Sequence, residues 1–179
     1  MKKALSFLLL YYCATGLSQE RMISKSGKIT FEASVPSFEE VKAVNTNVTF
    51  VLNTQTGEIA SLALMKGFRF KVALMEEHFN ENYTESDLYP KATFKGKIDG
   101  FDLRKLMSNP NDFTIKGILE LHGKSKTINI TARISKSVTG LVIVSDFIVD
   151  AHDFNIAIPN LVKNKISDKI NIHIAALLK

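Results

Sequence analysis

Four histidines are the residues best suited to chemistry in this chain, and they are widely spaced: His78, His122, His152 and His173. Zinc sites need ligands at short, characteristic spacings, and these histidines match no zinc-protease or paired-cysteine pattern. The chain has a single cysteine, Cys13, so a cysteine cluster is excluded as well. We therefore expect no metal site and no cofactor.

The acidic residues next to histidines do not form a convincing catalytic pair. His152 and Asp153 are adjacent, but neighbours on an extended chain point to opposite faces, so they are poorly placed to act together. Glu76, Glu77 and Glu81 have the pattern of a solvated helix face rather than of an acid and base pair. No nucleophile elbow, phosphate-binding glycine loop or dinucleotide fingerprint is present. The sequence favours a function other than catalysis.

Two histidines lie where the sequence predicts the end of a structural element. His78 falls in a short predicted helix, in which Leu74, Met75 and Phe79 recur at helical spacing. His122 begins the turn His122-Gly123-Lys124-Ser125. Each side chain could contact a ligand, although a polar cap that hydrogen-bonds a loop is the more ordinary role.

The elements that position these residues are mostly strands. Alternating apolar and polar residues predict strands at 29–34, 48–52, 58–65, 92–98, 113–121, 128–134, 141–149 and 166–174. Residues 38–45 could form a helical turn or a bent strand, and 153–159 a short extended connection. The strand at 58–65 is apolar on both faces from Ile59 onward, so we expect the helix near His78 to cover it.

The strand after the predicted helix indicates which side chains face inward. Phe94 and Ile98 share one face, while Lys95 and Lys97 point the other way. Gly96 is on the inner face and has no side chain, which predicts width that a filled core would not need.

About eight antiparallel strands must hide their edges, and closing the sheet into a barrel does so. The predicted fold is therefore all-β: an extended antiparallel barrel of about eight strands, with the short helix as a lid. A two-sheet sandwich is the structural rival. A barrel of this size either fills its interior with side chains or holds one small apolar ligand.

The N-terminus has the pattern of a secretory signal peptide over residues 1–18. Basic Lys2 and Lys3 precede an apolar run at 4–14, and Gly16-Leu17-Ser18 resembles a cleavage site. The run is too short to cross a bilayer, which needs about 20 apolar residues. A lipid-modified Cys13 is the alternative, but bulky Tyr12 precedes it. We expect a periplasmic or secreted protein without an integral membrane span.

The remainder, residues 19–179, is expected to form one domain with a sizeable core, because the chain is 45% hydrophobic and 23% charged. Removing Lys2 and Lys3 lowers the formal charge from +5 to +3. The excess is mild and spread along the chain, which argues against nucleic acid as a partner. The mature chain would contain no cysteine, so its stability must come from packing rather than from disulfides.

The sequence resembles the YceI family of lipocalin-like, polyisoprenoid-binding periplasmic proteins. The resemblance rests on an ordered set of segments: Phe31 to Ser37, His78-Phe79 through Tyr89-Pro90 to Phe94, the hairpin Lys116 to Lys126, and Asp153-Phe154-Asn155-Ile156 with the last strand. It implies a lipocalin-like barrel with an apolar lumen for a long-chain lipid.

The function expected from these observations is an exported binding protein that carries or sequesters a long hydrophobic chain, such as a polyisoprenoid or a fatty acyl chain. An enzyme acting on a bound lipid and a ligand-free stress-response interaction protein stay open, as does a homodimer. The candidate ligand contacts are Phe31, Phe50, Phe94, Ile98, Leu119, Ile130, Ile172, His78 and His122.

Overall fold

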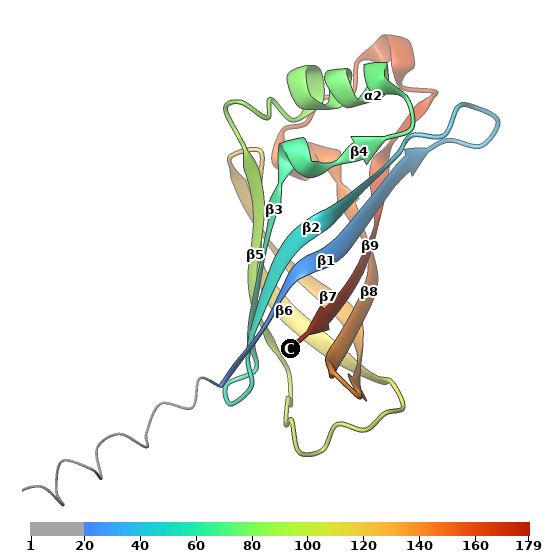
Figure 1. Ribbon diagram of the computed structural model, residues 1–179. Coiled ribbons are helices and arrows are strands. Elements are labelled where there is room, and N and C mark those ends of the chain that lie inside the picture. The colour runs from blue at the N-terminus through green and yellow to red at the C-terminus, as the bar shows by residue number, and fades with distance from the viewer. Residues whose placement is uncertain (1–19) are drawn as a thin grey trace, which may run out of the picture.

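The computed structural model describes residues 20–179, so the predicted signal peptide lies outside the described residues. Within them, eight long antiparallel strands close into a barrel, and a ninth strand of two residues adds to it (Figure 1). The long strands are β1 Arg21–Ser34, β2 Lys42–Asn53, β3 Glu58–Leu64, β5 Lys91–Ile98, β6 Asn111–Leu121, β7 Lys124–Ser137, β8 Gly140–Asp150 and β9 Ile166–Leu178. The predicted all-β, lipocalin-like barrel is confirmed, and a sandwich is excluded.

The barrel closes because β1 pairs with both β2 and β9. The strand order runs β1-β9-β8-β7-β6-β5-β3-β2 and returns to β1. Beyond the end of β9, the backbone of Lys179 still exchanges hydrogen bonds with Ile23 of β1, at 2.8 and 3.1 Å. The eight long strands therefore have neighbours on both sides, as the need to hide sheet edges predicts.

The β6–β7 hairpin was predicted correctly and shows why its turn residues matter. The turn consists of His122 and Gly123, with φ angles of 49° and 70°. Positive φ at both central residues is the geometry of a type I′ turn, whose twist matches that of the flanking strands. Glycine adopts this φ freely, whereas a histidine there is uncommon.

Several strand predictions were wrong in extent or environment. β1 begins at Arg21 rather than at Ile29, because bulges in its pairing with β2 interrupt the alternation of its first half. Residues 38–45 were predicted as a helical turn or a bent strand. Their second half belongs to β2, which begins at Lys42, and their first half is neither helix nor strand. β3 is not covered on both sides: Leu62 and Leu64 lie exposed on the outer surface.

The lid covers the upper end of the barrel in Figure 1 and confirms the predicted short helix. It consists of the 3₁₀ turn η2 (Met65–Gly67), strand β4 (Arg69–Phe70), helix α2 (Ala73–His78) and the π-helical turn η3 (Phe79–Tyr83). The helix packs against β4 rather than over β3. This explains why the outer leucines of β3 stay in contact with solvent.

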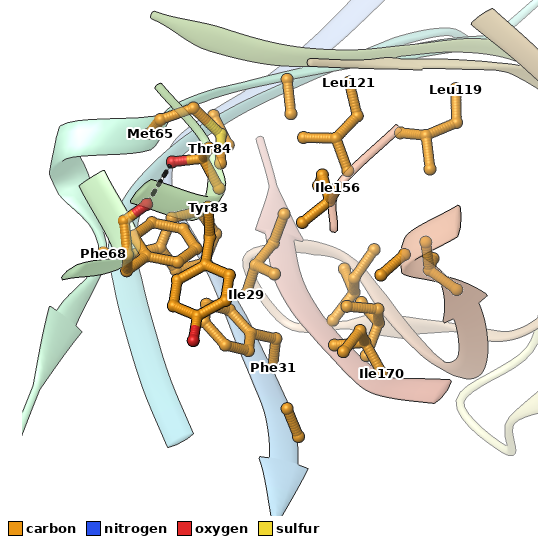
Figure 2. Close-up of a pocket in the computed structure, with 18 of the residues that line it drawn as sticks. Ile29, Phe31, Met65, Phe68, Tyr83, Thr84, Leu119, Leu121, Ile156 and Ile170 are labelled. Atoms are coloured by element: carbon orange, nitrogen blue, oxygen red, sulfur yellow. Dashed lines mark hydrogen bonds between the residues drawn. The ribbon is translucent and has the colours of Figure 1, made fainter. Parts of the chain in front are cut away.

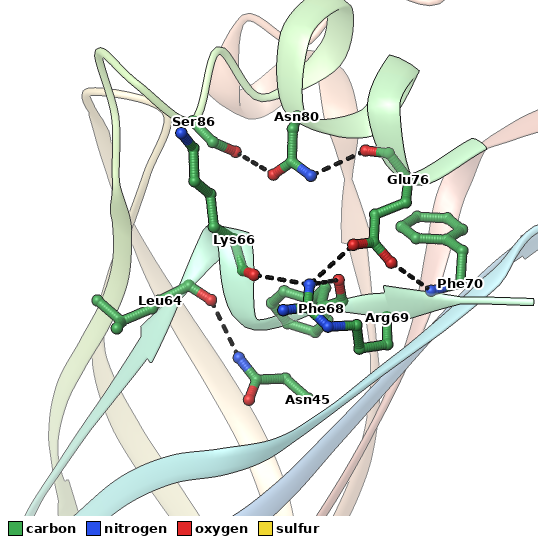
Figure 3. A network of polar contacts seen from close by, with 9 residues as sticks. All are labelled: Asn45, Leu64, Lys66, Phe68, Arg69, Phe70, Glu76, Asn80 and Ser86. Carbon is green, nitrogen blue, oxygen red and sulfur yellow. Dashed lines mark hydrogen bonds and ion pairs between the residues drawn. The ribbon is translucent and has the colours of Figure 1, made fainter. Parts of the chain in front are cut away.

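Polar contacts hold the lid in place, as Figure 3 shows. The Glu76 carboxylate accepts hydrogen bonds from Arg69 Nη1 at 2.8 Å and from the backbone N–H of Phe70 at 3.1 Å. Asn80 donates to the Glu76 carbonyl at 2.8 Å and accepts from Ser86 Oγ at 2.7 Å. Glu76 is thus a structural residue of the lid, whereas the sequence predicted a solvated helix face for it.

The connection between β8 and β9 also lies at the lid end. It contains the 3₁₀ turns η4 (Ala151–Phe154) and η5 (Asn160–Val162). The extended conformation predicted for 153–159 was therefore wrong at its start. Phe154 is 1% exposed, so burial of this ring favours the compact turn.

The opposite end of the barrel is closed by packed side chains. Ile98 at the end of β5 is 1% exposed and belongs to the same buried cluster as Leu106, with Phe101 packed against it. Both of these partners lie in the long connection between β5 and β6. In the described part of the chain, no helix is long and apolar enough to cross a bilayer.

Candidate functional site

The barrel encloses a cavity of about 470 Å³, a volume in the range of small-molecule sites. Every long strand contributes apolar lining side chains, and Figure 2 shows part of this wall. One residue from each strand, in chain order, gives Ile29, Phe50, Ile59, Phe94, Leu119, Ile130, Phe147 and Ile172. The period of two along each strand explains this, since alternate side chains point into the lumen.

Four phenylalanines form an aromatic cluster beneath the lid. Phe31 of β1 stacks on Phe79 of the lid with ring centroids 5.2 Å apart, and the remaining close pairs lie between 5.2 and 5.9 Å. Phe68 and Phe70 complete the cluster, and all four rings line the cavity. Of these, the sequence analysis selected only Phe31. The alternation of Phe68 and Phe70 was a signal that it did not use.

The polar side chains buried in the cavity wall, Ser145 and Thr84, already have hydrogen-bond partners. Ser145 Oγ donates to the Thr131 carbonyl at 2.7 Å, and Thr84 Oγ1 donates to the Phe79 carbonyl at 2.8 Å. Burial raises the pKa of the Tyr83 phenol, which favours its neutral form. Throughout residues 20–179, no buried polar side-chain atom lacks a partner. The wall therefore presents mainly hydrocarbon to any occupant.

The space over Gly96 is occupied, which corrects one expectation. A Cβ built on Gly96 would lie 2.8 Å from Phe94 Cζ, and one on Gly117 of β6 would lie 2.5 Å from the same atom. The Phe94 ring therefore covers both glycines. Gly96 leaves room for a neighbouring ring and not for extra lumen width, a known way in which an aromatic side chain protects strand glycines.

The structure brings most of the predicted contact residues together around the cavity: Phe31, Phe50, Phe94, Leu119, Ile130, Ile172 and His78. Ile98 and His122 are not among the residues that line it. Ile98 faces inward as predicted, but it packs in the closed end of the barrel. His122 lies in a turn outside the lumen.

His122 joins three segments at the lid end of the barrel. Its Nδ1 lies 2.9 Å from the Phe154 carbonyl oxygen of η4, and its Nε2 lies 2.8 Å from a carboxylate oxygen of Glu85. Because a carbonyl only accepts, Nδ1 must be the donor. The Tyr89 ring packs edge-on against the imidazole at 4.5 Å. These contacts match the interpretation of His122 as a polar cap that hydrogen-bonds loops.

Exposed residues of the cavity wall mark an opening to the surface, which we call the mouth. Among the described residues, three that line the cavity are exposed: Glu39 from the β1–β2 connection, and Leu74 and His78 from α2. His78 is the last residue of α2, so the helix places it at this opening. No sequence pattern connected Glu39 with α2, because the two segments are more than thirty positions apart.

The remaining histidines lie outside the cavity. His152 Nε2 lies 3.3 Å from Asp168, and His173 Nδ1 lies 2.6 Å from Asp146. The chain at His152 is a 3₁₀ turn and not extended as expected, yet Asp153 still points elsewhere and pairs with Lys126. In the region that the structure covers, no three potential ligands are grouped to hold a metal ion.

Several solved structures share this fold at low sequence identity. A polyisoprenoid binding domain from Saccharophagus degradans superimposes with a TM-score of 0.76, at 14% identity, over 89% of this chain and 98% of the other. BcnA of Burkholderia cenocepacia gives 0.69, at 13% identity, over 86% and 96%. The YceI protein of Campylobacter jejuni gives 0.63, at 17% identity, over 81% and 87%.

A search of curated proteins found no match. The family model described as "YceI-like domain" matches residues 19–177, which is nearly the whole of the chain that forms the barrel and its lid. The match includes the lid, the β6–β7 hairpin and the last strand, on which the resemblance in the sequence rested. The chain is therefore a member of the YceI-like family.

Proposed function

We propose that this protein binds a long apolar chain, such as a polyisoprenoid or a fatty acyl chain, inside the barrel. The observation that carries the proposal is the cavity itself: a volume of about 470 Å³, walled by apolar side chains from every long strand. The structural relative from Saccharophagus degradans, described as a polyisoprenoid binding domain, supports the same class of ligand.

The energetics favour a flexible hydrocarbon over a compact polar molecule. Moving each CH₂ group from water into an apolar environment contributes about 0.8 kcal/mol, whereas a polar group without a partner costs about 1–3 kcal/mol. The polar atoms of Ser145 and Thr84 are committed to backbone carbonyls. A ligand with its polar end at the mouth and its chain in the lumen meets both conditions.

We also propose that the protein acts outside the cytoplasm and as a carrier rather than an enzyme. The pattern of Lys2, Lys3 and the apolar run after them supports export. For a carrier, the support is the wall: the hydroxyl groups of its buried residues Ser145 and Thr84 make structural hydrogen bonds to backbone carbonyls. His122 is likewise engaged in contacts with Phe154 and Glu85.

Native mass spectrometry of the protein purified from its own host tests the binding proposal. We expect a species heavier than the polypeptide by the mass of one lipid, and recovery of that lipid by organic extraction. Recovery of a chemically altered lipid after incubation would favour an enzyme. Protein that is consistently empty would overturn the carrier and favour the ligand-free interaction protein.

A further inference from the structure

Large apolar side chains are exposed on three segments around the mouth. Leu74 of α2 is itself a mouth residue and is 56% exposed. Phe38, which precedes Glu39 in the β1–β2 connection, is 45% exposed, and Leu161 of η5, which precedes the lining residue Val162, is 89% exposed. Single exposed apolar side chains are ordinary on a protein surface, but three that gather around the opening of an apolar cavity point to a surface that is covered during function.

Basic residues accompany this apolar surface. Lys163 and Lys165 follow η5 directly and are exposed. Neither forms an ion pair with any residue that the structure describes. On the other side of the mouth, the carboxylate of Glu40 lies 3.7 Å from Lys42. The neighbouring acidic residue, Glu39, lines the cavity. We call Phe38, Leu74, Leu161, Lys163 and Lys165 the docking rim.

The chemistry of the docking rim fits a lipid bilayer better than a protein partner. Its apolar residues lie singly on three separate segments, whereas a protein groove for a helix or strand presents a continuous apolar surface. Isolated apolar side chains beside lysines are suited to the bilayer interface, where the apolar group enters the acyl region and the ammonium groups meet lipid phosphates.

Position adds a second reason. A long apolar chain that crosses water between a membrane and the cavity exposes each of its CH₂ groups to water, which is unfavourable. If the mouth rests on the bilayer, the chain passes from one apolar phase to another with little exposure. The docking rim lies around the part of the cavity wall where, among residues 20–179, lining residues are exposed.

We propose that the docking rim binds the surface of an anionic phospholipid bilayer, so that the mouth exchanges its ligand directly with the membrane. The exchange of ligand with the membrane rests on the proposed function. Binding of the protein to the membrane surface depends only on the rim residues, so membrane binding and lipid binding can be tested separately.

Sedimentation with vesicles of phosphatidylcholine, with and without phosphatidylglycerol, measures the interaction. We expect binding that needs phosphatidylglycerol and weakens with added salt, because screening shortens the range of the lysine charges. Lys163→Gln/Lys165→Gln should weaken binding about 30-fold, since each lysine near an anionic surface contributes about 1 kcal/mol. Leu161→Ser should weaken binding to the vesicles that contain phosphatidylglycerol about tenfold, and it should not change the salt dependence of that binding.

Matched controls separate the rim from general surface properties. Lys95→Gln/Lys97→Gln removes two exposed lysines with the same spacing from the outer face of β5, and Val138→Ser removes a fully exposed apolar side chain from the β7–β8 turn at the far end of the barrel. Neither should change binding by more than about twofold. Equal losses in the rim and control variants, or wild-type protein that does not bind anionic vesicles, would overturn the docking rim and leave a protein partner as the explanation.

The bound lipid of each sample, measured by extraction, distinguishes the two proposals. If the wild-type protein carries lipid but does not bind vesicles, the docking-rim proposal alone is wrong. Protein that binds vesicles through the rim but never carries lipid contradicts the proposed carrier function alone. Melting temperatures close to the wild-type value in all variants would show that the substitutions act at the surface.

Discussion

The ring of Phe94 covers Gly117 of the neighbouring strand, so closely that a Cβ on this glycine would lie 2.5 Å from Phe94 Cζ. Gly117 pairs with Gly96 across β5 and β6, and the same ring covers Gly96 as well. The two glycines leave the space that the ring occupies. Because Phe94 lines the cavity, the position of its ring affects the shape of the lumen at the level of the glycine pair.

Gly117→Ala should push the ring away from the wall and destabilise the barrel. The new methyl group would also approach the Lys95 carbonyl oxygen at 2.5 Å, and crowding of this kind costs about 1–3 kcal/mol. We expect a lower urea midpoint and retention of shorter lipid chains. In a Phe94→Ala background, the part of the cost that comes from the ring should disappear. An unchanged cost in that background would show that the ring is not the obstacle.

Phe94 variants test the lumen more directly. Phe94→Ala should fold, at a cost of up to about 3 kcal/mol for the half-buried ring, and should shift retention toward bulkier or longer chains. Phe94→Asp should lose the lipid and destabilise the barrel, because an unpaired charge among apolar groups costs several kcal/mol. Lys95→Ala points outward and should do neither. Circular dichroism and lipid extraction of the three variants distinguish these outcomes.

The strands were predictable wherever side chains alternate without interruption. The hairpin at 113–134 was located correctly because its inward isoleucines keep a period of two and its turn contains Gly123. The first half of β1 was missed because bulges near Ser24 and Gly27 shift its register. β3 was assigned a cover on both faces because Leu62 and Leu64 have the same pattern whether a helix or solvent faces them. The period of apolar residues in a strand shows which side chains share a face, but it does not show whether protein or solvent lies against that face.

The cavity wall was partly predictable for the same reason, but the contacts between distant segments were not. Inward residues such as Phe31 and Ile172 follow from strand periodicity. The link from His122 to Phe154 spans 32 positions and its link to Glu85 spans 37, and no local pattern indicates either. The mouth likewise depends on how α2 lies relative to the β1–β2 connection, which the closure of the barrel decides.

The contacts of Asp150 predict how the stability of the folded protein depends on pH. Its carboxylate forms an ion pair with Lys169 and accepts a hydrogen bond from the backbone N–H of His152 at 2.9 Å. The Lys169 side chain, followed by this N–H, lowers the pKa of Asp150 below its ordinary 3.8. The stabilisation is therefore fully present above pH 3.8 and is lost as the pH falls through the lower pKa of the folded state.

Thermal melts of wild-type protein and Asp150→Asn across this range check the sign. The wild type should melt at the higher temperature at neutral pH, and the difference should shrink as the pH falls below 3.8. Asp112→Asn, a change at an exposed carboxyl group on β6, serves as the control. A difference that grows toward acid would mean that Asp150 does not stabilise the fold as a carboxylate.

Variants of His122 and Glu85 allow us to compare how much the two contacts of the His122 ring, and its backbone conformation, contribute to stability. The ring is largely buried, whereas the Glu85 side chain is 51% exposed. Exposed ion pairs contribute less than about 1 kcal/mol, while a buried carbonyl that loses its donor costs about 1–3 kcal/mol. The hydrogen bond to Phe154 should therefore contribute more to stability than the contact with Glu85.

His122→Asn, His122→Ala and Glu85→Asn separate these effects. Asparagine tolerates positive φ, which both His122 and Glu85 adopt, but it is too short to replace the contacts. We expect His122→Ala to lower stability most, because it also disfavours the turn, and Glu85→Asn least. Hydrogen exchange at 151–158 should rise in both His122 variants and stay unchanged in Glu85→Asn. If Glu85→Asn loosens that segment equally, the Glu85 contact rather than the Phe154 carbonyl holds η4 against the hairpin.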